Sequence, residues 1–292
     1  MTGIRAILNI GSDVSYCVGN FHQGLDHPEC ITWGCDGFAY AGGEGGQVYR
    51  IDIHNGSFEH FASTGGFVGG LCQDASGNIY ACSQGAILKV TPEGMTETYS
   101  RTVPSEPLLK NPNYPAFDRV GNLYVTDSGK WKKDNGKIFR FSPGGTGSVW
   151  TDQLKTFPNG ICMSSDERYL YVALSLNFPR IERIPIKHNG EAGEPELVVA
   201  LPDCVPDGIA FDTDGNLYIS CYRPDRIYKF SSTSKRLDIL VEDFEGTLMA
   251  APTNIAFCGS KRDILLSSNL GRWHISRYKW KLSGLPLHYP II

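Results

Sequence analysis

The sequence has no long apolar run and no excess of positive charge. A membrane-spanning helix needs about 18 consecutive apolar residues, and no stretch of this chain approaches that length, nor does its N-terminus carry the apolar run of a signal peptide. We therefore expect a cytoplasmic protein with no membrane partner. The 27 Lys and Arg residues stand against 31 Asp and Glu, a formal charge of −4. We expect no nucleic-acid partner, because a basic excess is what neutralises a phosphate backbone.

The cysteines also lack the spacing of a metal or redox motif. There are nine, an odd number, and none forms a CxxC pair. Five lie inside apolar runs: Cys72, Cys82, Cys162, Cys221 and Cys258. Free cysteine packs as a small apolar side chain, so we predict buried thiols rather than disulfides.

Glycine and proline are abundant, with 33 and 17 residues. This content is typical of many short strands joined by turns. The chain also repeats itself: DASGNIYAC, DRVGNLYVTD and DTDGNLYISC begin at Asp74, Asp118 and Asp212, and three degenerate copies begin at Gly34, Ser164 and Cys258. Measured between their equivalent turn positions, successive copies are spaced by 40 to 47 residues; these positions are Gly37, Gly77, Gly121, Arg168, Gly215 and Arg262. A period in the forties is typical of a β-propeller.

Each copy contains the pattern of a four-stranded antiparallel sheet. An apolar run such as GIAF at 208–211 leads through an Asp/Gly turn to a second run such as NLYISC at 216–221, and two further runs follow. We therefore predict an all-β, six-bladed propeller that uses residues 1–292 as a single domain. The sixth copy lacks a fourth strand after Trp280, while residues 14–21 precede the first copy unassigned. We predict that this N-terminal segment closes the last blade and protects its edge.

The residue just before the first strand occupies the same place in every copy. These six positions are Glu29, Gly69, Asn113, Asn159, Asp207 and Thr253. The first strand of a propeller blade is the innermost, so these side chains should surround one end of the central channel. Taken singly, the PNG and PDG segments that contain Asn159 and Asp207 are also typical of turns.

Two carboxylates and two carboxamides in one structural position favour a metal site, because carboxylates that face each other in a narrow channel are costly without a cation. With no His or Cys in the ring, oxygen ligation favours a single hard divalent cation such as Ca²⁺, Mg²⁺ or Mn²⁺ over Zn²⁺. The loops between the second and third strands should roof this end of the channel. They contribute Glu44, Ser128, Trp131, Tyr222, Arg223, Arg272, Trp273 and His274 as candidate pocket walls. His274 has the alternative of packing within the last blade.

The motifs together resemble the SMP-30/gluconolactonase/luciferin-regenerating enzyme (LRE) family over essentially the whole chain. The segments that carry the resemblance are HPECITW, GGEGGQVYRID, NYPAFDRVGNLYVTDSG, FPNGICMS, VPDGIAFDTDGNLYISC, APTNIAF and NLGRWHI. The resemblance implies a six-bladed propeller whose channel holds a divalent cation, for which we favour Ca²⁺, with Mg²⁺, Mn²⁺ or Zn²⁺ as alternatives. It implies that Glu29, Asn159 and Asp207 are metal ligands, that Asp207 is the candidate general base, and that Asn113 lies at the edge of the metal or substrate.

The sequence departs from the sugar lactonases of this family at two positions. Tyr114 follows Asn113 where those enzymes usually have Asp, and Asn111 stands where they have Arg. The ligand positions are retained, but these substitutions argue against a sugar lactone as the substrate. Candidate substrate-binding residues are Asn113, Tyr114, Trp131, Arg223 and His274.

Two classes of function remain open at this stage. The first is a metal-dependent hydrolase that opens a lactone or similar cyclic ester, with Asp207 positioning or deprotonating the attacking water. A phosphotriesterase, or a natural-product hydrolase or isomerase, would use the same site, because a fold and a metal do not define a substrate. The second class is a propeller that binds a small molecule without catalysis.

Overall fold

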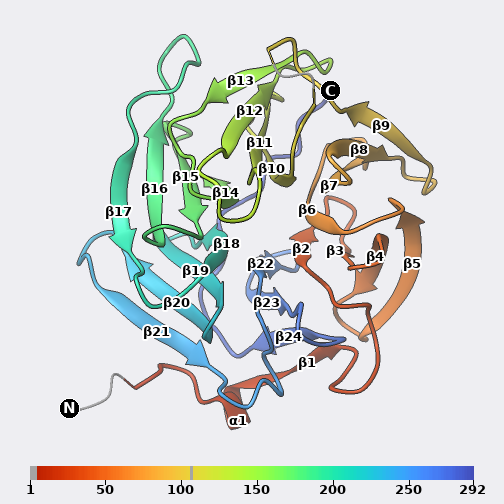
Figure 1. Ribbon diagram of the computed structural model, residues 1–292. Helices are drawn as coiled ribbons and strands as arrows, with labels where there is room; N and C mark the ends of the chain where they lie inside the picture. Colours follow the sequence, from red (N-terminus) through yellow and green to blue (C-terminus); the bar gives the residue numbers. More distant parts are fainter. Residues whose placement is uncertain (1–4, 106–107) are drawn as a thin grey trace.

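The apolar runs of the sequence form strands, and the repeated Asp/Gly motifs form turns between them. Residues 5–105 and 108–292 are described by the computed structural model, in which six four-stranded antiparallel sheets surround a central axis (Figure 1). The protein is a six-bladed β-propeller, which confirms the predicted fold. The one helix among the described residues is α1 (Ile10–Asp13). No helix in the described part of the chain is long and apolar enough to span a membrane.

Blades 1 to 5 follow the chain in order, and each runs from the axis outward. Blade 1 consists of β2 (Cys30–Trp33), β3 (Ala39–Gly42), β4 (Gln47–Asp52) and β5 (Ser57–Ser63). Blade 2 consists of β6 (Val68–Gln73), β7 (Ile79–Ser83), β8 (Ala86–Val90) and β9 (Thr96–Ser100). Blade 3 consists of β10 (Pro112–Phe117), β11 (Leu123–Asp127), β12 (Lys137–Phe141) and β13 (Gly147–Thr151). Blade 4 consists of β14 (Pro158–Met163), β15 (Tyr169–Leu174), β16 (Arg180–Pro185) and β17 (Glu196–Ala200). Blade 5 consists of β18 (Pro206–Phe211), β19 (Asn216–Tyr222), β20 (Asp225–Ser231) and β21 (Leu237–Glu242).

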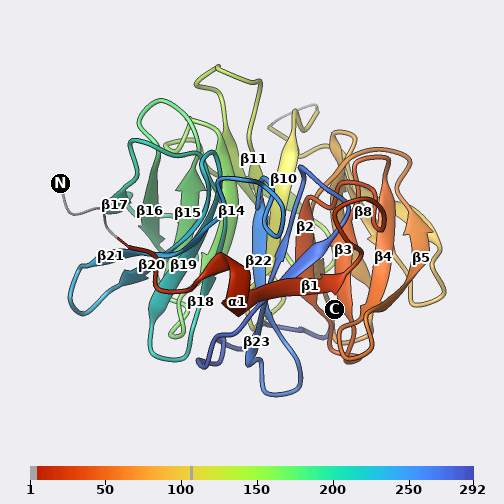
Figure 2. The same cartoon turned by 90° about the horizontal axis from the view of Figure 1, so that it is seen from below.

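Blade 6 joins the two halves of the chain. Its inner strands are β22 (Asn254–Cys258), β23 (Ile264–Ser268) and β24 (Ile275–Tyr278), and its outermost strand is β1 (Val14–Val18). Strand β1 pairs antiparallel with β24, and the two lie side by side in Figure 1. Figure 2 shows β1 in red beside blue strands from the C-terminal part of the chain. The N-terminal segment therefore closes the last blade, as predicted.

The repeated Asp of the sequence motif stabilises the first turn of its blade. The carboxylate of Asp118 accepts hydrogen bonds from the backbone nitrogens of Val120 and Asn122, at 3.1 and 2.8 Å, and from the side chain of Asn122 at 2.6 Å. Asp74 and Asp212 make the same turn, and each also accepts a tyrosine hydroxyl. A short carboxylate that bonds the backbone two and four residues ahead favours a tight turn. The motif is thus structural, although it set the repeat period.

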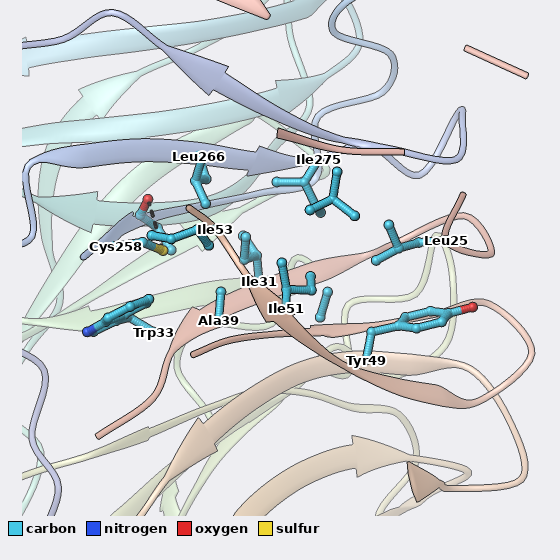
Figure 3. Close-up of a cluster of buried hydrophobic side chains, with 13 residues drawn as sticks. Leu25, Ile31, Trp33, Ala39, Tyr49, Ile51, Ile53, Cys258, Leu266 and Ile275 are labelled. Carbon is cyan, nitrogen blue, oxygen red and sulfur yellow. Dashed lines mark hydrogen bonds between the residues drawn. The ribbon is translucent and has the colours of Figure 1, made fainter. Parts of the chain in front are cut away.

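Apolar side chains fill the spaces between adjacent blades. Figure 3 shows the cluster where blade 1 meets blade 6, in which Leu25, Ile31 and Ile51 pack with Leu266 and Ile275. All five side chains are almost completely buried. Burying an aliphatic side chain contributes about 1.5–3 kcal/mol, so each such contact between blades stabilises the ring and keeps its inner strands in place.

All nine cysteines are free thiols. Of the five predicted to be buried, Cys82, Cys221 and Cys258 are buried, while Cys72 and Cys162 are half-buried where their strands face the channel. The two closest sulfurs belong to Cys204 and Cys221, with their Sγ atoms 3.3 Å apart.

Candidate metal and active site

The six inner strands place the predicted ring residues at equivalent points. Glu29 and Thr253 directly precede β2 and β22, while Asn113, Asn159 and Asp207 are the second residues of β10, β14 and β18. These strands surround the axis in Figure 1. Gly69 takes the corresponding place in β6 and offers no side chain.

Irregular strand pairing accompanies three of the polar positions. The register between the first and second strands of a blade shifts between Pro112 and Pro115, between Pro158 and Ile161, and between Pro206 and Ile209. A bulge bends its strand and redirects a side chain, and bulges are common beside active sites. Each of these shifts brackets Asn113, Asn159 or Asp207. The first strands of blades 1 and 6 pair without a shift.

The glycine after each of two ligand positions is required by close packing rather than by a turn. A Cβ atom on Gly160 would lie 2.4 Å from the carbonyl oxygen of Asp207, and one on Gly208 would lie 2.7 Å from the Cα of Asn254. Neither glycine adopts a positive φ. The PNG and PDG segments are therefore strand residues, and the alternative interpretation of them as simple turns is wrong. Their glycines bring the ligand-bearing strands of adjacent blades together.

The polar side chains of the ring are buried, and several of their oxygens have no partner. Glu29, Asn113, Asn159 and Asp207 each expose less than a tenth of their surface. Oε2 of Glu29 and Oδ1 of both Asn113 and Asn159 accept no hydrogen bond from any described residue. A buried polar atom without a partner costs free energy, so these oxygens fit a group that they would contact.

Burial raises the pKa values of both carboxyl groups of the ring. Burial raises the pKa of Glu29 to about 8; a hydrogen bond from Thr253 opposes this rise, and the charge of Glu44 adds to it. Burial, followed by the charge of Glu29, raises the pKa of Asp207 well above its usual range. Burial and the charges of Asp207 and Glu29 also raise the pKa of Tyr222, which places this tyrosine near the carboxyl pair. A cation would offset the repulsion that these shifts report.

The donor set fits a hard divalent cation. Carboxylate and carboxamide oxygens are the ligands that Ca²⁺ prefers, and the ring offers no sulfur or imidazole. Glu29, Asn159 and Asp207 would hold the ion, with Asn113 beside it. The unpartnered oxygens of Glu29, Asn113 and Asn159 are the structural observation on which this fit depends.

Tyr114 lies inside the channel rather than in its roof. Its hydroxyl is 3.5 Å from Oδ1 of Asn254, so the side chain reaches from blade 3 to blade 6 on the opposite side of the ring. Beyond it, the second halves of the inner strands line a cavity of about 110 Å³ with mainly apolar side chains. Residues 285–289 also line this cavity. The channel therefore has a carboxylate end and an apolar end.

Trp131 and Arg223 lie in exposed loops. Trp131, between β11 and β12, is 51% exposed and packs edge-on against the ring of Phe157, with centroids 5.0 Å apart. Arg223, between β19 and β20, approaches Asp225 at 3.9 Å, and its side chain is 74% exposed. Both side chains are free to meet a ligand at the rim.

His274 belongs to the packing of blade 6. It is fully buried, its Nε2 lies 3.1 Å from the carbonyl oxygen of Leu248, and its ring packs edge-on against Tyr16. Burial lowers its pKa, which keeps the ring neutral. The structure favours the alternative in which His274 packs within blade 6, where its ring is held by β1 and by the loop after β21. Its role in binding a substrate stays a prediction.

The sequence analysis missed Asp26 and His27, which form a cluster of charged and polar side chains with Glu44. Nδ1 of His27 lies 3.1 Å from Asp26 and 3.5 Å from Glu44. Partial burial raises the pKa of Asp26, but hydrogen bonds from His27, Gln47 and the backbone of Gly45 lower it below its usual value. Asp26 and His27 lie just upstream of Glu29 in the segment DHPE, and this proximity to a predicted ligand could have identified them. Asp26 mainly holds the glycine-rich loop after β3 in place.

The comparison with protein families agrees with the propeller architecture. Residues 27–268 match the family described as the SMP-30/Gluconolactonase/LRE-like region. The chain belongs to this family. The matched residues include blades 1 to 5 and the four ring residues Glu29, Asn113, Asn159 and Asp207.

Two staphylococcal proteins named lactonase drp35 are similar in sequence. The protein from Staphylococcus saprophyticus is 25% identical over 162 residues, which cover 53% of this chain and 49% of the relative. The protein from Staphylococcus haemolyticus is 23% identical over 239 residues, which cover 77% of this chain and 72% of the relative. The first match thus spans about half the length of that relative.

Two solved structures share the fold. A Xanthomonas campestris gluconolactonase superimposes with a TM-score of 0.74 at 20% identity, covering 91% of this chain and 88% of its own. A calcium-binding regucalcin from Agrobacterium tumefaciens superimposes with a TM-score of 0.75 at 15% identity, covering 95% of this chain and all of its own. At these identities the likeness establishes the propeller and not an activity.

Proposed function

We propose that the protein is a divalent-cation-dependent hydrolase that opens a lactone or a similar cyclic ester. One observation carries the proposal: two buried carboxyl groups and two buried carboxamides occupy equivalent positions in four blades, and three of their oxygens have no partner. The names of the two staphylococcal relatives favour the lactone substrate class.

Glu29, Asn159 and Asp207 are the proposed ligands, with Asn113 at the edge of the ion. The oxygen-only donor set favours Ca²⁺, with Mg²⁺, Mn²⁺ or Zn²⁺ as alternatives. The calcium-binding regucalcin with the same fold supports this choice. Two carboxylates balance the charge of one divalent ion.

The chain's own residues supply the remaining chemistry. The bound cation would act as a Lewis acid towards the ester carbonyl. Asp207 acts as the general base: its carboxylate, which is buried in the ring, accepts a proton from the attacking water. Tyr222, Trp131 and Arg223 contact the part of the small-molecule substrate that lies outside the ring. No serine nucleophile is required.

The alternative is a propeller that binds calcium or a small molecule without catalysis. The calcium-binding description of regucalcin favours it, and so does the replacement by Tyr114 of the Asp that sugar lactonases of this family carry. A phosphotriesterase is the alternative within the enzymes.

The test compares two ligand variants in a lactone hydrolysis assay. Asp207→Asn keeps an oxygen donor of nearly the same shape but cannot accept a proton at neutral pH. We expect its kcat to fall by roughly 10²- to 10⁴-fold at saturating Ca²⁺, as is typical for the loss of a general base. Glu29→Gln is the matched control, because it removes one ligand charge and leaves the base, and its loss should be smaller once Ca²⁺ saturates the site.

Three outcomes would change this interpretation. Equal and small losses in the two variants would make Asp207 a ligand only. Hydrolysis by the wild type that is indifferent to chelation and readdition of divalent metal would contradict metal dependence. Turnover of phosphotriesters alone, or no turnover by protein shown to hold its metal, would favour the phosphotriesterase or the binding propeller.

A further inference from the structure

We propose that Ser175 is a positioning residue that turns the carboxamide of Asn159 so that its oxygen, and not its NH₂ group, faces the cation. This inference rests on the cation site proposed above and deepens it. Ser175 directly follows β15 in blade 4, is 1% exposed, and lies outside the ring of ligands. It acts only through Asn159.

The hydrogen bonds of Ser175 leave one orientation for the amide. A serine hydroxyl has a single proton to donate. Ser175 donates it to the carbonyl oxygen of Pro206 at 2.7 Å. Its oxygen lies 3.2 Å from the side chain of Asn159, and towards that neighbour it can only accept. The amide must therefore present its NH₂ group to Ser175, which leaves Oδ1 as the atom without a partner among residues 5–105 and 108–292.

This orientation matters because the two faces of a carboxamide have opposite polarity. The carbonyl oxygen of Asn159 would stabilise a cation, whereas a flipped amide would direct two N–H donors towards it. The carbonyl that receives the Ser175 proton belongs to Pro206, the residue before Asp207. One hydroxyl thus connects the amide ligand of blade 4 to the strand that carries the carboxylate of blade 5.

Blade 3 provides a natural control for this arrangement. Ser128 directly follows β11 and is fully buried, so its side chain is not exposed in a pocket wall as the sequence had predicted. Its hydroxyl donates to the carbonyl oxygen of Pro158 at 2.8 Å. Pro158 precedes Asn159 just as Pro206 precedes Asp207. Ser128 therefore makes the same kind of bond between blades as Ser175. Unlike that of Ser175, its hydroxyl makes no hydrogen bond with a side-chain amide of any described residue. Comparing the two serines separates amide orientation from the joining of blades.

The experiment measures Ca²⁺ affinity by isothermal titration calorimetry on protein stripped with chelator. Ser175→Ala should weaken Ca²⁺ binding by about 10-fold or more, as is typical when a residue that orients a ligand is removed. Ser128→Ala should keep the wild-type affinity within about twofold. Both variants lose one buried hydrogen bond between blades, so their melting temperatures should fall by a similar few degrees.

A second measurement needs no metal. The side-chain NH₂ signals of Asn159, assigned by their absence from Asn159→Ala, should be protected from hydrogen exchange in the stripped wild type. They should remain protected in Ser128→Ala and lose protection in Ser175→Ala, since Ser175 is their acceptor.

The possible failures are distinct. A folded wild type that binds neither Ca²⁺ nor Mn²⁺ overturns the proposed cation site and the function built on it. Ca²⁺ binding that weakens equally in both serine variants, or an Asn159 amide that exchanges freely in the stripped wild type, overturns the role of Ser175 alone.

Discussion

Among single residues, His274 gives the clearest reason to expect that the free energy of unfolding depends on pH. Burial, aided by the charge of Arg272, lowers its pKa in the folded protein below the ordinary 6.5, despite opposing effects of the Leu248 carbonyl and Asp243. An unfolded chain therefore takes up the proton at a higher pH than the folded one. The resulting stability is present above pH 6.5 and is lost as the pH falls through the folded pKa.

We expect His274→Gln to flatten this dependence. Urea unfolding between pH 7.5 and 5 should show a smaller decrease in the free energy of unfolding than for the wild type. At pH 7.5 the variant should be less stable by about 1 kcal/mol, because its contact with Leu248 is disturbed. His54→Gln, in an exposed turn, is the control and should keep the wild-type slope. An unchanged slope in His274→Gln would show that acid instability arises elsewhere.

At the scale of the element, β1 closes the ring by pairing with β24. Val18 is 2% exposed on this strand, whereas Ser15 points to solvent. Val18→Asp should lower the free energy of unfolding by about 3 kcal/mol or more, because it buries an unpaired charge. Ser15→Asp adds the same charge to the same strand and should change it by less than about 0.5 kcal/mol. Equal, small effects in a denaturant titration would contradict the closure of blade 6 by β1.

For the molecule as a whole, the C-terminal segment connects separate blades across the apolar end of the channel. Leu285 donates its backbone N–H to the carbonyl oxygen of Phe211 in blade 5, and Tyr289 donates its hydroxyl to the carbonyl oxygen of Trp33 in blade 1. His288 lies 3.2 Å from Glu167 of blade 4. These bonds hold the segment over the apolar cavity.

Removing residues 283–292 should therefore expose the cavity. We expect a lower melting temperature and increased binding of an apolar fluorescent dye, since several inter-blade bonds and the burial of Leu285 are lost together. Tyr289→Phe removes one hydrogen bond only and should cost about 1 kcal/mol. A truncated protein with the melting temperature and dye binding of the wild type would show that the segment contributes nothing to closure.

The sequence by itself determined the number of blades, their order, the closing strand and the equivalence of the ring positions. These features follow from local periodicity: the turn made by Asp118 and Asn122 depends on residues four apart, and alternating apolar strands need no distant partner to be recognised. Residues 14–21 could be assigned because the sixth repeat lacked one strand.

The tertiary structure alone decided how the side chains face one another. Gly160 and Gly208 are needed because an adjacent strand approaches them closely, and Tyr114 reaches a residue 140 positions away across the channel. His274 is buried by a strand from the far end of the chain, and Ser175 orients Asn159 through a bond to another blade. Such contacts join segments that the chain brings together only when the ring closes, so no local pattern in the sequence records them.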